Sequence, residues 1–387
     1  MDKIKLGILG IGNIGGHHVN KILDGQCPEI ELYAICDLVE ERTSWVKEKL
    51  PSVKCFSDAE EMMDSGIDAI LVAVPHYDHP KFAIMAMKKG IHTLIEKPAG
   101  VYTKQVLEMN RVADECNVKF ALMMNQRTNC IYRKMHEIVK SGEMGAIKRT
   151  NWIITNWYRP QAYYNSGGWR ATWQGEGGGV LLNQCPHNLD LWQWICGMPV
   201  KIDAKLHYGK WHDIEVEDDV SAYVEYENGA TGIFVTTTGD FPGSNRFEIT
   251  LEKGKLIAEG DKLMMWKSEI SEPEFSRTNE IAFGWPEIVE SEVETDGKNE
   301  QHVGVLNAFA SAILRDTPLV ADGREGINGL TISNAMHLSS WLGKEITLAD
   351  FDDELFYNEL MKRVATSRRK TEVKELVESD MGASFKK

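Results

Sequence analysis

The sequence predicts an α/β protein in two parts, a parallel sheet followed by a domain with a large, mostly antiparallel open sheet. Over the first 124 residues, short apolar segments alternate with helical ones, a pattern typical of βαβ units and a parallel sheet. From residue 201 to about 266, strand-like segments follow one another without helices, which favours antiparallel pairing. A length of 387 residues suits two domains.

The elements of the first part follow from apolar runs and their stop signals. Pro75 stops one strand, Gly90 marks a normal helix end, and Thr103 suits an N-cap. We expect strands at 4–9, 31–36, 68–74, 91–95 and 119–123. We expect helices from the glycines to residue 23 and at 38–50, 79–89 and 103–116.

The pattern changes after about residue 125, where a helix is expected at 132–140. Asn228-Gly229 predicts a tight hairpin in the strand-rich region. Residues 267–300 are polar and acidic and predict an irregular surface segment. Helices are expected at 303–314 and 324–343, and a charged helical segment from 350. We therefore expect one domain at 1–124 and a second α/β domain at 125–387 that closes with these helices.

Composition limits the classes of partner. The chain has 43 basic and 58 acidic residues, a formal charge of −15, which disfavours nucleic acid and anionic membranes as partners. Seven scattered cysteines without a C-x-x-C pair argue against a disulfide framework or a thiolate zinc site and fit a reducing compartment. We see no signal-peptide layout and no apolar run of transmembrane length. We therefore expect a cytoplasmic protein.

Glycines after the first strand follow the pattern G-x-G-x-x-G. Gly10 would permit the tight turn, Gly12 would let backbone N–H groups approach a pyrophosphate, and Gly15 would let the helix pack close to the strand. Asp37 ends the second strand about 20 residues later, where a carboxylate accepts ribose hydroxyls and repels a 2′-phosphate. Leu38 follows, where an Arg would favour NADP. The pattern predicts a Rossmann domain that binds NAD; the alternative is a glycine-rich turn beside a surface Asp.

Lys97 is a candidate catalytic residue. It lies in Glu96-Lys97-Pro98, directly after the fifth parallel strand. Ligands of open α/β sheets bind beyond the carboxyl ends of the strands. The alternative is a solvated surface lysine.

His187 is the second candidate. Asn183, His187 and Asp190 are spaced to share one face of a helix, and Pro186 either begins that helix nearby or kinks it. Imidazole titrates near neutrality and suits general acid–base chemistry on a hydroxyl. The alternatives are a structural histidine or a metal ligand. No second His or Cys stands at ligand spacing, so we expect no metal.

Three motifs in order resemble the Gfo/Idh/MocA family, named for glucose–fructose oxidoreductase and inositol dehydrogenase. They are the glycine pattern, Glu96-Lys97-Pro98, and the run from Gly177 through His187 to Asp190. The resemblance covers essentially the whole chain. It implies a Rossmann domain, a second domain that binds substrate and whose open sheet forms oligomer contacts, and hydride transfer between a nicotinamide and a sugar or cyclitol carbon.

The resemblance also implies roles for single residues. Lys97 would contact the substrate hydroxyl and the nicotinamide ribose, and His187 would be the acid/base, with Asn183 in the catalytic set. Many members carry Asp where this chain has Asn183, although some sugar-acting members carry Asn; a neutral amide can position a hydroxyl but cannot exchange its proton. His79 matches a recurrent histidine near the nicotinamide pocket. The other implied cofactor contacts are Asn13, Ile14, Pro75, His76 and Glu96.

Aromatic residues gather before the His187 segment. Aromatic faces pack against the C–H faces of pyranose rings, and arginines orient polar groups. The alternative is an aromatic core or a subunit interface. Seven of residues 152–173 are aromatic, namely Trp152, Trp157, Tyr158, Tyr163, Tyr164, Trp169 and Trp173. The segment 158–170 resembles that of members that oxidise pyranosides at C3, including levoglucosan and glycoside 3-dehydrogenases. The expected substrate residues are Lys97, Tyr158, Arg159, Trp169, Arg170, Asn183 and His187.

We therefore expect an NAD-dependent dehydrogenase that acts on a ring hydroxyl and assembles as a homodimer or homotetramer. One alternative is a redox-assisted glycosidase, which oxidises the sugar, eliminates the aglycone and then restores the hydroxyl with retained NADH. Another is a non-catalytic sugar sensor that binds NAD and partners a regulator. The presence of both Lys97 and His187 disfavours the sensor.

Overall fold

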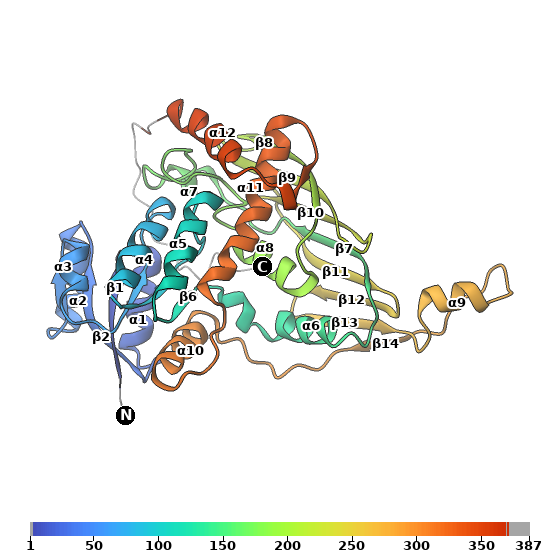
Figure 1. Cartoon of the computed structure of the whole chain (residues 1–387), viewed down its shortest axis with the longest axis horizontal. Helices are drawn as coiled ribbons and strands as arrows, with labels where there is room; N and C mark the ends of the chain where they lie inside the picture. The colour runs from blue at the N-terminus through green and yellow to red at the C-terminus, as the bar shows by residue number, and fades with distance from the viewer. Residues whose placement is uncertain (1–2, 369, 371–387) are drawn as a thin grey trace. The chain divides into compact units, whose positions relative to one another are not determined.

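The computed structural model describes residues 3–368 and 370, which form two compact units. The first unit contains residues 3–128 and 299–330, and the second contains 129–298 and the described residues from 331 onward. Figure 1 shows the elements coloured along the chain. The second domain expected from the sequence, 125–387, differs from this division because it includes residues 299–330, which the structure places in the first unit.

The first unit is built on a six-stranded parallel sheet in the order β3-β2-β1-β4-β5-β6. The strand order reverses between β1 and β4, and at such a point an open α/β sheet binds its ligand. The strands are β1 (Ile4–Leu9), β2 (Ile30–Cys36), β3 (Lys54–Phe56), β4 (Ala69–Val72), β5 (His92–Ile95) and β6 (Phe120–Leu122). The predicted parallel sheet of βαβ units is confirmed.

Helices connect these strands and cover the sheet. They are α1 (Asn13–Leu23), α2 (Glu40–Lys49), α3 (Ala59–Met63), α4 (His79–Lys88), α5 (Thr103–Glu115) and α10 (Gln301–Arg315). Single 3₁₀ turns are η1 (His76–Asp78), η2 (Asn125–Thr128) and η3 (Gly323–Glu325). The sequence did not predict β3 or α3, because β3 is three partly or fully exposed residues without an apolar run and α3 has only five residues.

The core of the first unit explains why residues 299–330 belong to it. Leu6 and Ile35 on neighbouring strands are fully buried. Leu306 and Phe309 of α10 lie in the same buried cluster, at most 1 % exposed. An amphipathic helix buries its apolar face only by packing on a partner. Here that partner is the core of the parallel sheet.

The second unit is built on a nine-stranded sheet in the order β14-β13-β12-β11-β7-β10-β9-β8-β15. Among these described strands, β7 and β10 pair in parallel and the other neighbours pair antiparallel. The predicted large, mostly antiparallel sheet is confirmed. Its strands are β7 (Ile147–Ile154), β8 (Lys201–Tyr208), β9 (Glu217–Glu225), β10 (Thr231–Thr237), β11 (Asn245–Leu251), β12 (Gly254–Glu259), β13 (Lys262–Lys267), β14 (Val289–Glu292) and β15 (Ile346–Thr347).

The hairpin predicted at Asn228-Gly229 joins β9 to β10, and Gly229 has a positive φ of 82°. Residues 267–300, expected to be irregular, contain α9 and β14, and Figure 1 shows α9 beyond the edge of the sheet. The remaining helices are α6 (Cys130–Ser141), α7 (Gln161–Asn165), α8 (Pro186–Cys196), α9 (Glu272–Thr278), the 3₁₀ turn η4 (Leu348–Asp350) and α12 (Asp353–Ala365). Helix α11 (Gly326–Leu342) begins in the first unit and continues in the second. The charged helical segment expected from 350 includes α12, and its part beyond 370 lies outside the described residues.

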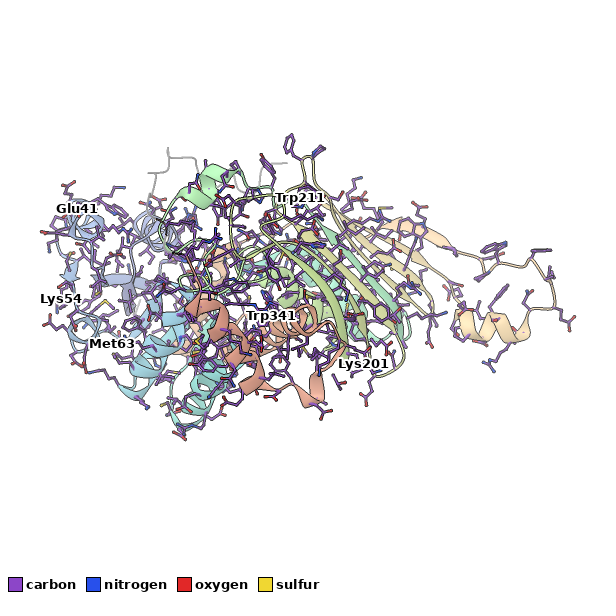
Figure 2. All side chains as sticks on the ribbon, turned by 90° about the horizontal axis from the view of Figure 1, so that it is seen from above. Glu41, Lys54, Met63, Lys201, Trp211 and Trp341 are labelled. Atoms are coloured by element: carbon purple, nitrogen blue, oxygen red, sulfur yellow. The ribbon has the colours of Figure 1, made fainter. Side chains whose placement is uncertain are left out.

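Aromatic stacking fixes helices in the second unit. Trp192 of α8 stacks on Phe234 at 5.3 Å between ring centroids, and its Nε1–H donates to the Thr150 hydroxyl at 3.1 Å. Trp341 of α11, labelled in Figure 2, stacks on Phe356 of α12 at 5.3 Å. Helix α8 is therefore held on the sheet through Trp192. No helix in residues 3–368 is long and apolar enough to cross a bilayer.

Phe309→Ala tests the contribution of α10 to the core of the first unit. Because Phe309 is 1 % exposed, truncation should lower the free energy of unfolding by about 3–5 kcal/mol. Urea denaturation measures this value. Ala308→Ser, at a half-buried position of the same helix, is the control; equal losses for both variants would contradict the placement of Phe309.

Candidate functional site

The glycine loop after β1 is shaped by contacts that only glycine allows. Gly10 has a φ of 91°, and a Cβ on it would stand 2.6 Å from the Ala73 carbonyl oxygen. A Cβ on Gly15 would stand 1.9 Å from the Gly10 carbonyl oxygen. At Gly12, by contrast, no neighbouring heavy atom lies within 4 Å of an added Cβ. Gly10 and Gly15 thus serve the packing of α1 on the sheet, and Gly12 leaves space for a ligand.

The N-terminus of α1 suits an anion. The helix begins at Asn13, and its N-cap residue, Gly12, has no side chain that could cap the first N–H groups. The first turn, which includes Asn13 and Ile14, carries no acidic residue. Its N–H groups lack helical acceptors, and the helix dipole favours negative charge there. These residues fit the pyrophosphate of NAD.

Asp37 stands at the end of β2, beside the glycine loop. Its carboxylate accepts the N–H of Ile11 at 2.7 Å and the N–H of Val39 at 2.9 Å. Each carboxylate oxygen can accept more than one hydrogen bond. The arrangement therefore fits a ribose whose hydroxyls donate to Asp37. The Arg42 guanidinium lies 3.5 Å from the same carboxylate.

Glu96, directly before Lys97, is buried and paired. One of its oxygens lies 2.7 Å from His18 Nε2 on α1, and the other accepts the Lys97 N–H at 3.1 Å. Burial would raise the pKa of Glu96, but the hydrogen bond and charge of His18, with the charges of His302 and Lys97, lower it to about 2. Glu96 is thus an anion at neutral pH. With 3 % of its surface exposed, its contacts are with the protein, and a contact with the cofactor stays a prediction.

His79 holds the residue that follows Lys97. Its Nδ1 lies 2.7 Å from the Pro98 carbonyl oxygen, and its Nε2 lies 2.7 Å from the Val74 carbonyl oxygen. Carbonyl oxygens only accept, so a neutral ring with one N–H serves one contact and a protonated ring serves both. Burial lowers the pKa of His79, and the two carbonyls oppose that shift. Lys97 is therefore flanked by two held residues, Glu96 and Pro98.

These contacts give His79, at 1 % exposure, a different role from the one implied by the resemblance. It joins the loop after β4 to the loop after β5, and its contact with the nicotinamide stays a prediction. Pro75 precedes η1, whose first residue His76 is 6 % exposed. The cofactor contacts expected of Pro75 and His76 also stay predictions.

The segment that carries His187 follows the first of the two alternatives given for Pro186. The helix α8 begins at Pro186, so His187 lies in its first turn, half-buried. Asn183 lies in the turn before the helix and does not share its face. Asp190 is buried and accepts a hydrogen bond from Gln193 at 3.2 Å.

The glycine run before α8 is held by Glu217, which sequence reasoning did not single out. This fully buried carboxyl group accepts the N–H groups of Gly179 at 2.8 Å and Leu181 at 3.0 Å. A Cβ on Gly179 would stand 2.0 Å from the Glu217 carbonyl oxygen. Burial raises the pKa of Glu217 to about 8, against these hydrogen bonds. The glycine run before α8 therefore packs closely against Glu217, the first residue of β9.

The aromatic residues of segment 152–173 divide into two groups. Trp152, Tyr164 and Trp173 are at most 6 % exposed, so for them the core alternative holds. Tyr158 is 43 % exposed, and Trp169 is half-buried. The second group retains surface for a ligand.

Tyr163 joins the candidate substrate residues to one another. The Arg159 guanidinium lies 5.2 Å and the Arg170 guanidinium 4.5 Å from the centre of its ring. Its hydroxyl accepts from Arg170 at 2.8 Å and from the Gln184 amide at 3.3 Å. The aromatic segment is thus connected to the neighbour of Asn183.

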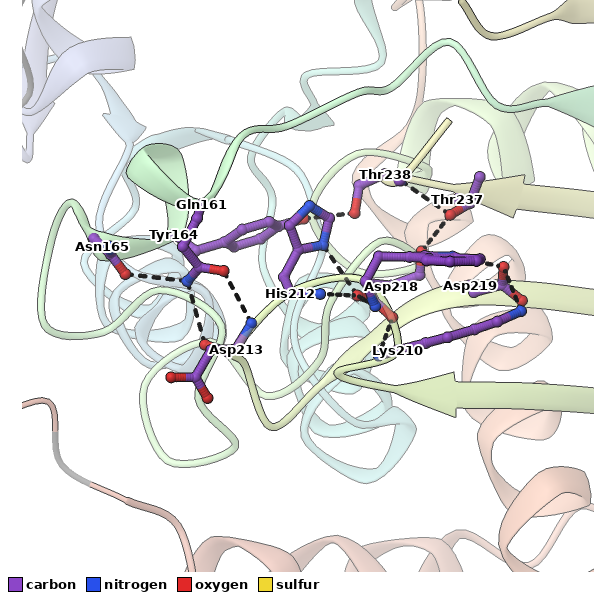
Figure 3. A network of polar contacts seen from close by, with 12 residues as sticks. Gln161, Tyr164, Asn165, Lys210, His212, Asp213, Asp218, Asp219, Thr237 and Thr238 are labelled. Carbon is purple, nitrogen blue, oxygen red and sulfur yellow. Dashed lines mark hydrogen bonds and ion pairs between the residues drawn. The ribbon is translucent and has the colours of Figure 1, made fainter. Parts of the chain in front are cut away.

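Figure 3 shows the polar network that supports this segment. The Tyr164 hydroxyl donates to Thr238 at 2.7 Å. The side-chain amide oxygen of Gln161 accepts the N–H of Asp213 at 2.9 Å. Asp218, fully buried, accepts three backbone N–H groups from residues 210–212 and contacts His212 Nδ1 at 3.0 Å. The network fixes α7 and the loop before β9.

The structure groups the candidates by unit. The first unit holds Gly10, Asp37, His79 and Lys97, and the second holds Tyr158, Arg159, Trp169, Arg170, Asn183 and His187. Within the second, Asn183 donates its amide to Glu176, a buried carboxylate that the sequence reasoning also missed. Nothing in the sequence predicts that a Glu in a glycine-rich segment is buried.

Family models match both units. Residues 4–124 match the oxidoreductase family with an NAD-binding Rossmann fold, and residues 132–257 match the Gfo/Idh/MocA C-terminal domain. The chain belongs to the Gfo/Idh/MocA family. The predicted family, the oxidoreductase class and NAD as cofactor are thereby confirmed.

Named relatives of this Gfo/Idh/MocA enzyme act on sugars or cyclitols. Myo-inositol 2-dehydrogenase of Thermotoga maritima is 26 % identical over 269 residues, which cover 66 % of this chain and 75 % of that protein. D-glucoside 3-dehydrogenase of Escherichia coli K12 is 25 % identical over 221 residues, covering 52 % and 61 %. The crystal structure of the WlbA dehydrogenase of Bordetella pertussis, in complex with NADH and UDP-GlcNAcA, has a TM-score of 0.77 and 25 % identity, covering 91 % of this chain and 99 % of that one.

Paired glycine variants separate packing from cofactor binding in this Gfo/Idh/MocA enzyme. Gly15→Ala should lower the free energy of unfolding by about 1–3 kcal/mol, because its methyl group meets a backbone oxygen. Gly12→Ala should leave stability within about 0.5 kcal/mol and weaken NADH binding about tenfold, or about 1.4 kcal/mol. Urea unfolding and NADH fluorescence titration measure both. Equal effects of the two variants would contradict the assignment.

Glu96→Gln tests the buried carboxylate through pH. The folded-state pKa of about 2 lies below the usual 4.5, so the stabilisation is complete above pH 4.5 and is lost as the pH falls toward 2. The stability advantage of wild type over Glu96→Gln should shrink as the pH falls from 6 to 3.5. Glu48→Gln, at an exposed position, should show no such trend; a constant advantage for Glu96 would contradict the lowered pKa.

Proposed function

We propose that this enzyme transfers a hydride from a ring hydroxyl carbon of a sugar, glycoside or cyclitol to NAD, with C3 of a pyranoside as the preferred position. The names of the inositol and glucoside dehydrogenases among its relatives support a ring hydroxyl as substrate. The observation that supports a pyranoside as substrate is the partly exposed surface of Tyr158 and Trp169, in the same segment as Arg159 and Arg170. Such a surface suits the C–H faces and hydroxyls of a pyranose.

The reaction requires the chain to remove a proton. NAD, when bound, supplies the hydride acceptor, and the alcohol loses one hydride and one proton as its C–O bond becomes a carbonyl. His187 takes the hydroxyl proton as general base. Lys97 holds the same oxygen and stabilises the negative charge that develops on it. Asn183, an amide, positions a hydroxyl without exchanging its proton.

The contacts around Lys97 support its assignment. Residues that stabilise developing charge must be held in place before the reaction. Glu96 and Pro98, on either side of Lys97, are held by His18 and His79 at 2.7 Å. An exposed surface lysine needs no such support. The ammonium group of Lys97 can thus be presented in a fixed direction.

A substrate panel with purified enzyme and NAD tests this function. Growth of the reduced-nicotinamide absorbance with methyl pyranosides, levoglucosan or inositols is the expected result. Lys97→Ala should lower kcat about 10²–10³-fold, whereas Lys88→Ala, at an exposed position on α4, should leave it unchanged. If the enzyme binds NAD but turns over no member of the panel, the proposal is wrong. Aglycone release without net NADH would replace it with the oxidation–elimination route.

We infer that the enzyme assembles with further copies of itself as a homodimer or homotetramer. The segment 268–292, which includes α9, exposes Ile281 at 70 %, Phe283 at 91 % and Trp285 at 86 %. Monomeric proteins rarely expose apolar side chains in such a contiguous group. A second copy of the chain would cover them.

Light scattering tests this assembly. The pair Phe283→Ser and Trp285→Ser should reduce the molar mass in solution toward that of one chain. Leu107→Ser, which removes a 48 % exposed apolar side chain elsewhere, should not. A monomeric wild type would contradict the inference.

A further inference from the structure

The side chain of Asn183 is bound by a buried carboxylate. Its Nδ2 donates to one oxygen of Glu176, and the other oxygen of Glu176 accepts the N–H of Ala171 at 2.5 Å. Glu176 is 2 % exposed. A buried carboxylate is costly unless hydrogen bonds satisfy it, and these two donors contribute to that.

The backbone is bent to reach this carboxylate. Ala171 has a φ of 53°, in the left-handed region that residues with a Cβ rarely adopt. Such a conformation persists only where surrounding contacts impose it, and it gathers at functional sites. Here the N–H of Ala171 points at Glu176. The backbone conformation at Ala171 therefore allows its N–H to bind the Glu176 carboxylate.

The hydrogen bond also orients Asn183. An amide has a donor group and an acceptor oxygen on opposite sides of one carbon. With the NH₂ group committed to Glu176, the carbonyl oxygen must point to the other side. A donor that binds an anion is polarised, and the carbonyl of the same amide then accepts more strongly. The carboxylate thus gives a neutral side chain a fixed and strengthened acceptor.

The negative charge of Glu176 is felt by its neighbours. It is among the causes that raise the pKa of Tyr164, after burial, and it adds to the burial that raises the pKa of Glu217. Both residues belong to elements that hold the candidate site: Tyr164 lies in α7, and Glu217 holds the run before α8.

We propose that Glu176 is a positioning residue for the reaction, which aims the carbonyl oxygen of Asn183 at the substrate hydroxyl and supplies, one hydrogen bond away, the negative charge that Asn183 lacks. The inference rests on the proposed function. It gives a physical reason why an amide can serve at position 183. The carboxylate of Glu176 lies one hydrogen bond away from that amide.

An exchange of the two groups tests the pair. Glu176→Gln places an amide next to the Asn183 amide, and one of the two hydrogen bonds that Glu176 accepts, from Asn183 or from Ala171, is lost. Asn183→Asp sets carboxylate against carboxylate, which repel. The double variant restores an amide–carboxylate pair in reversed order, with the carboxylate at position 183 accepting from the new amide at 176, whose oxygen still accepts from Ala171. Stability and kinetics are measured for all four proteins.

The expected result is reciprocal rescue. Each single variant should lower kcat about 10–100-fold with KM within about threefold, because the lost contact acts in the transition state. The double variant should recover most of the lost kcat and of the melting temperature, which shows coupling between the two positions. Unfolding of the four proteins reports the coupling even without turnover. Failure of the proposed function is therefore distinguishable from failure of this inference.

Glu215→Gln is the matched control. Glu215 accepts the N–H of Trp173 at 2.7 Å, in the same turn, and lies outside the proposed machinery. Its substitution should lower the melting temperature and leave kcat unchanged. A Glu176→Gln enzyme that is destabilised with full kcat, or a double variant no better than the singles, would overturn the inference and leave Glu176 a turn-forming residue.

Discussion

One buried hydrogen bond, between His18 and Glu96, ties together the working parts of the first unit. His18 lies on the helix whose N-terminus fits the pyrophosphate, and Glu96 ends the strand that delivers Lys97. Both side chains are inaccessible to solvent, so the loss of either would leave a polar group buried without its partner. The helix whose N-terminus fits a pyrophosphate and the segment that carries Lys97 are thereby joined. His79, the first residue of α4, contacts the Pro98 carbonyl oxygen and so holds the other side of Lys97.

The second unit also contains buried carboxyl groups that accept hydrogen bonds, but here the donors are backbone N–H groups. Asp218, Glu217 and Glu176 are carboxylates at most 2 % exposed that accept backbone N–H groups from irregular segments. Irregular segments have no ladder to satisfy their backbone donors. A buried carboxylate with several acceptor sites replaces the ladder locally. These side chains thus bind backbone donors in the segments before α8 and before β9.

Sequence reasoning succeeded where a local steric or periodic rule governs the structure. Gly10 and Gly15 are required by contacts inside one short loop, and the hairpin at Asn228-Gly229 follows from turn geometry. It missed features that depend on distant partners. Leu306 and Phe309 of α10 gave a clear helix, but nothing local shows whose core the helix completes.

The candidate site shows the same division. Lys97 and His187 stand in recognisable motifs, whereas Glu176 and Glu217 resemble solvated acids in a sequence. Their burial depends on N–H groups contributed by other turns. The two contacts of His79 with backbone carbonyls could not be read from residue types either, since every residue has a carbonyl. The sequence shows which side chains can form hydrogen bonds. It does not show which backbone groups they bind.

The return of residues 299–330 to the first unit has a consequence for the order of events on the ribosome. The parallel sheet is complete by residue 122, but the helix that covers part of its core begins at Gln301. At about 5–20 residues per second, residues 129–298 take roughly 10–30 s to synthesise. During that interval the nascent sheet presents an uncovered apolar surface. We therefore expect the nascent chain to be prone to association until α10 has been synthesised, whatever the stability of the finished enzyme.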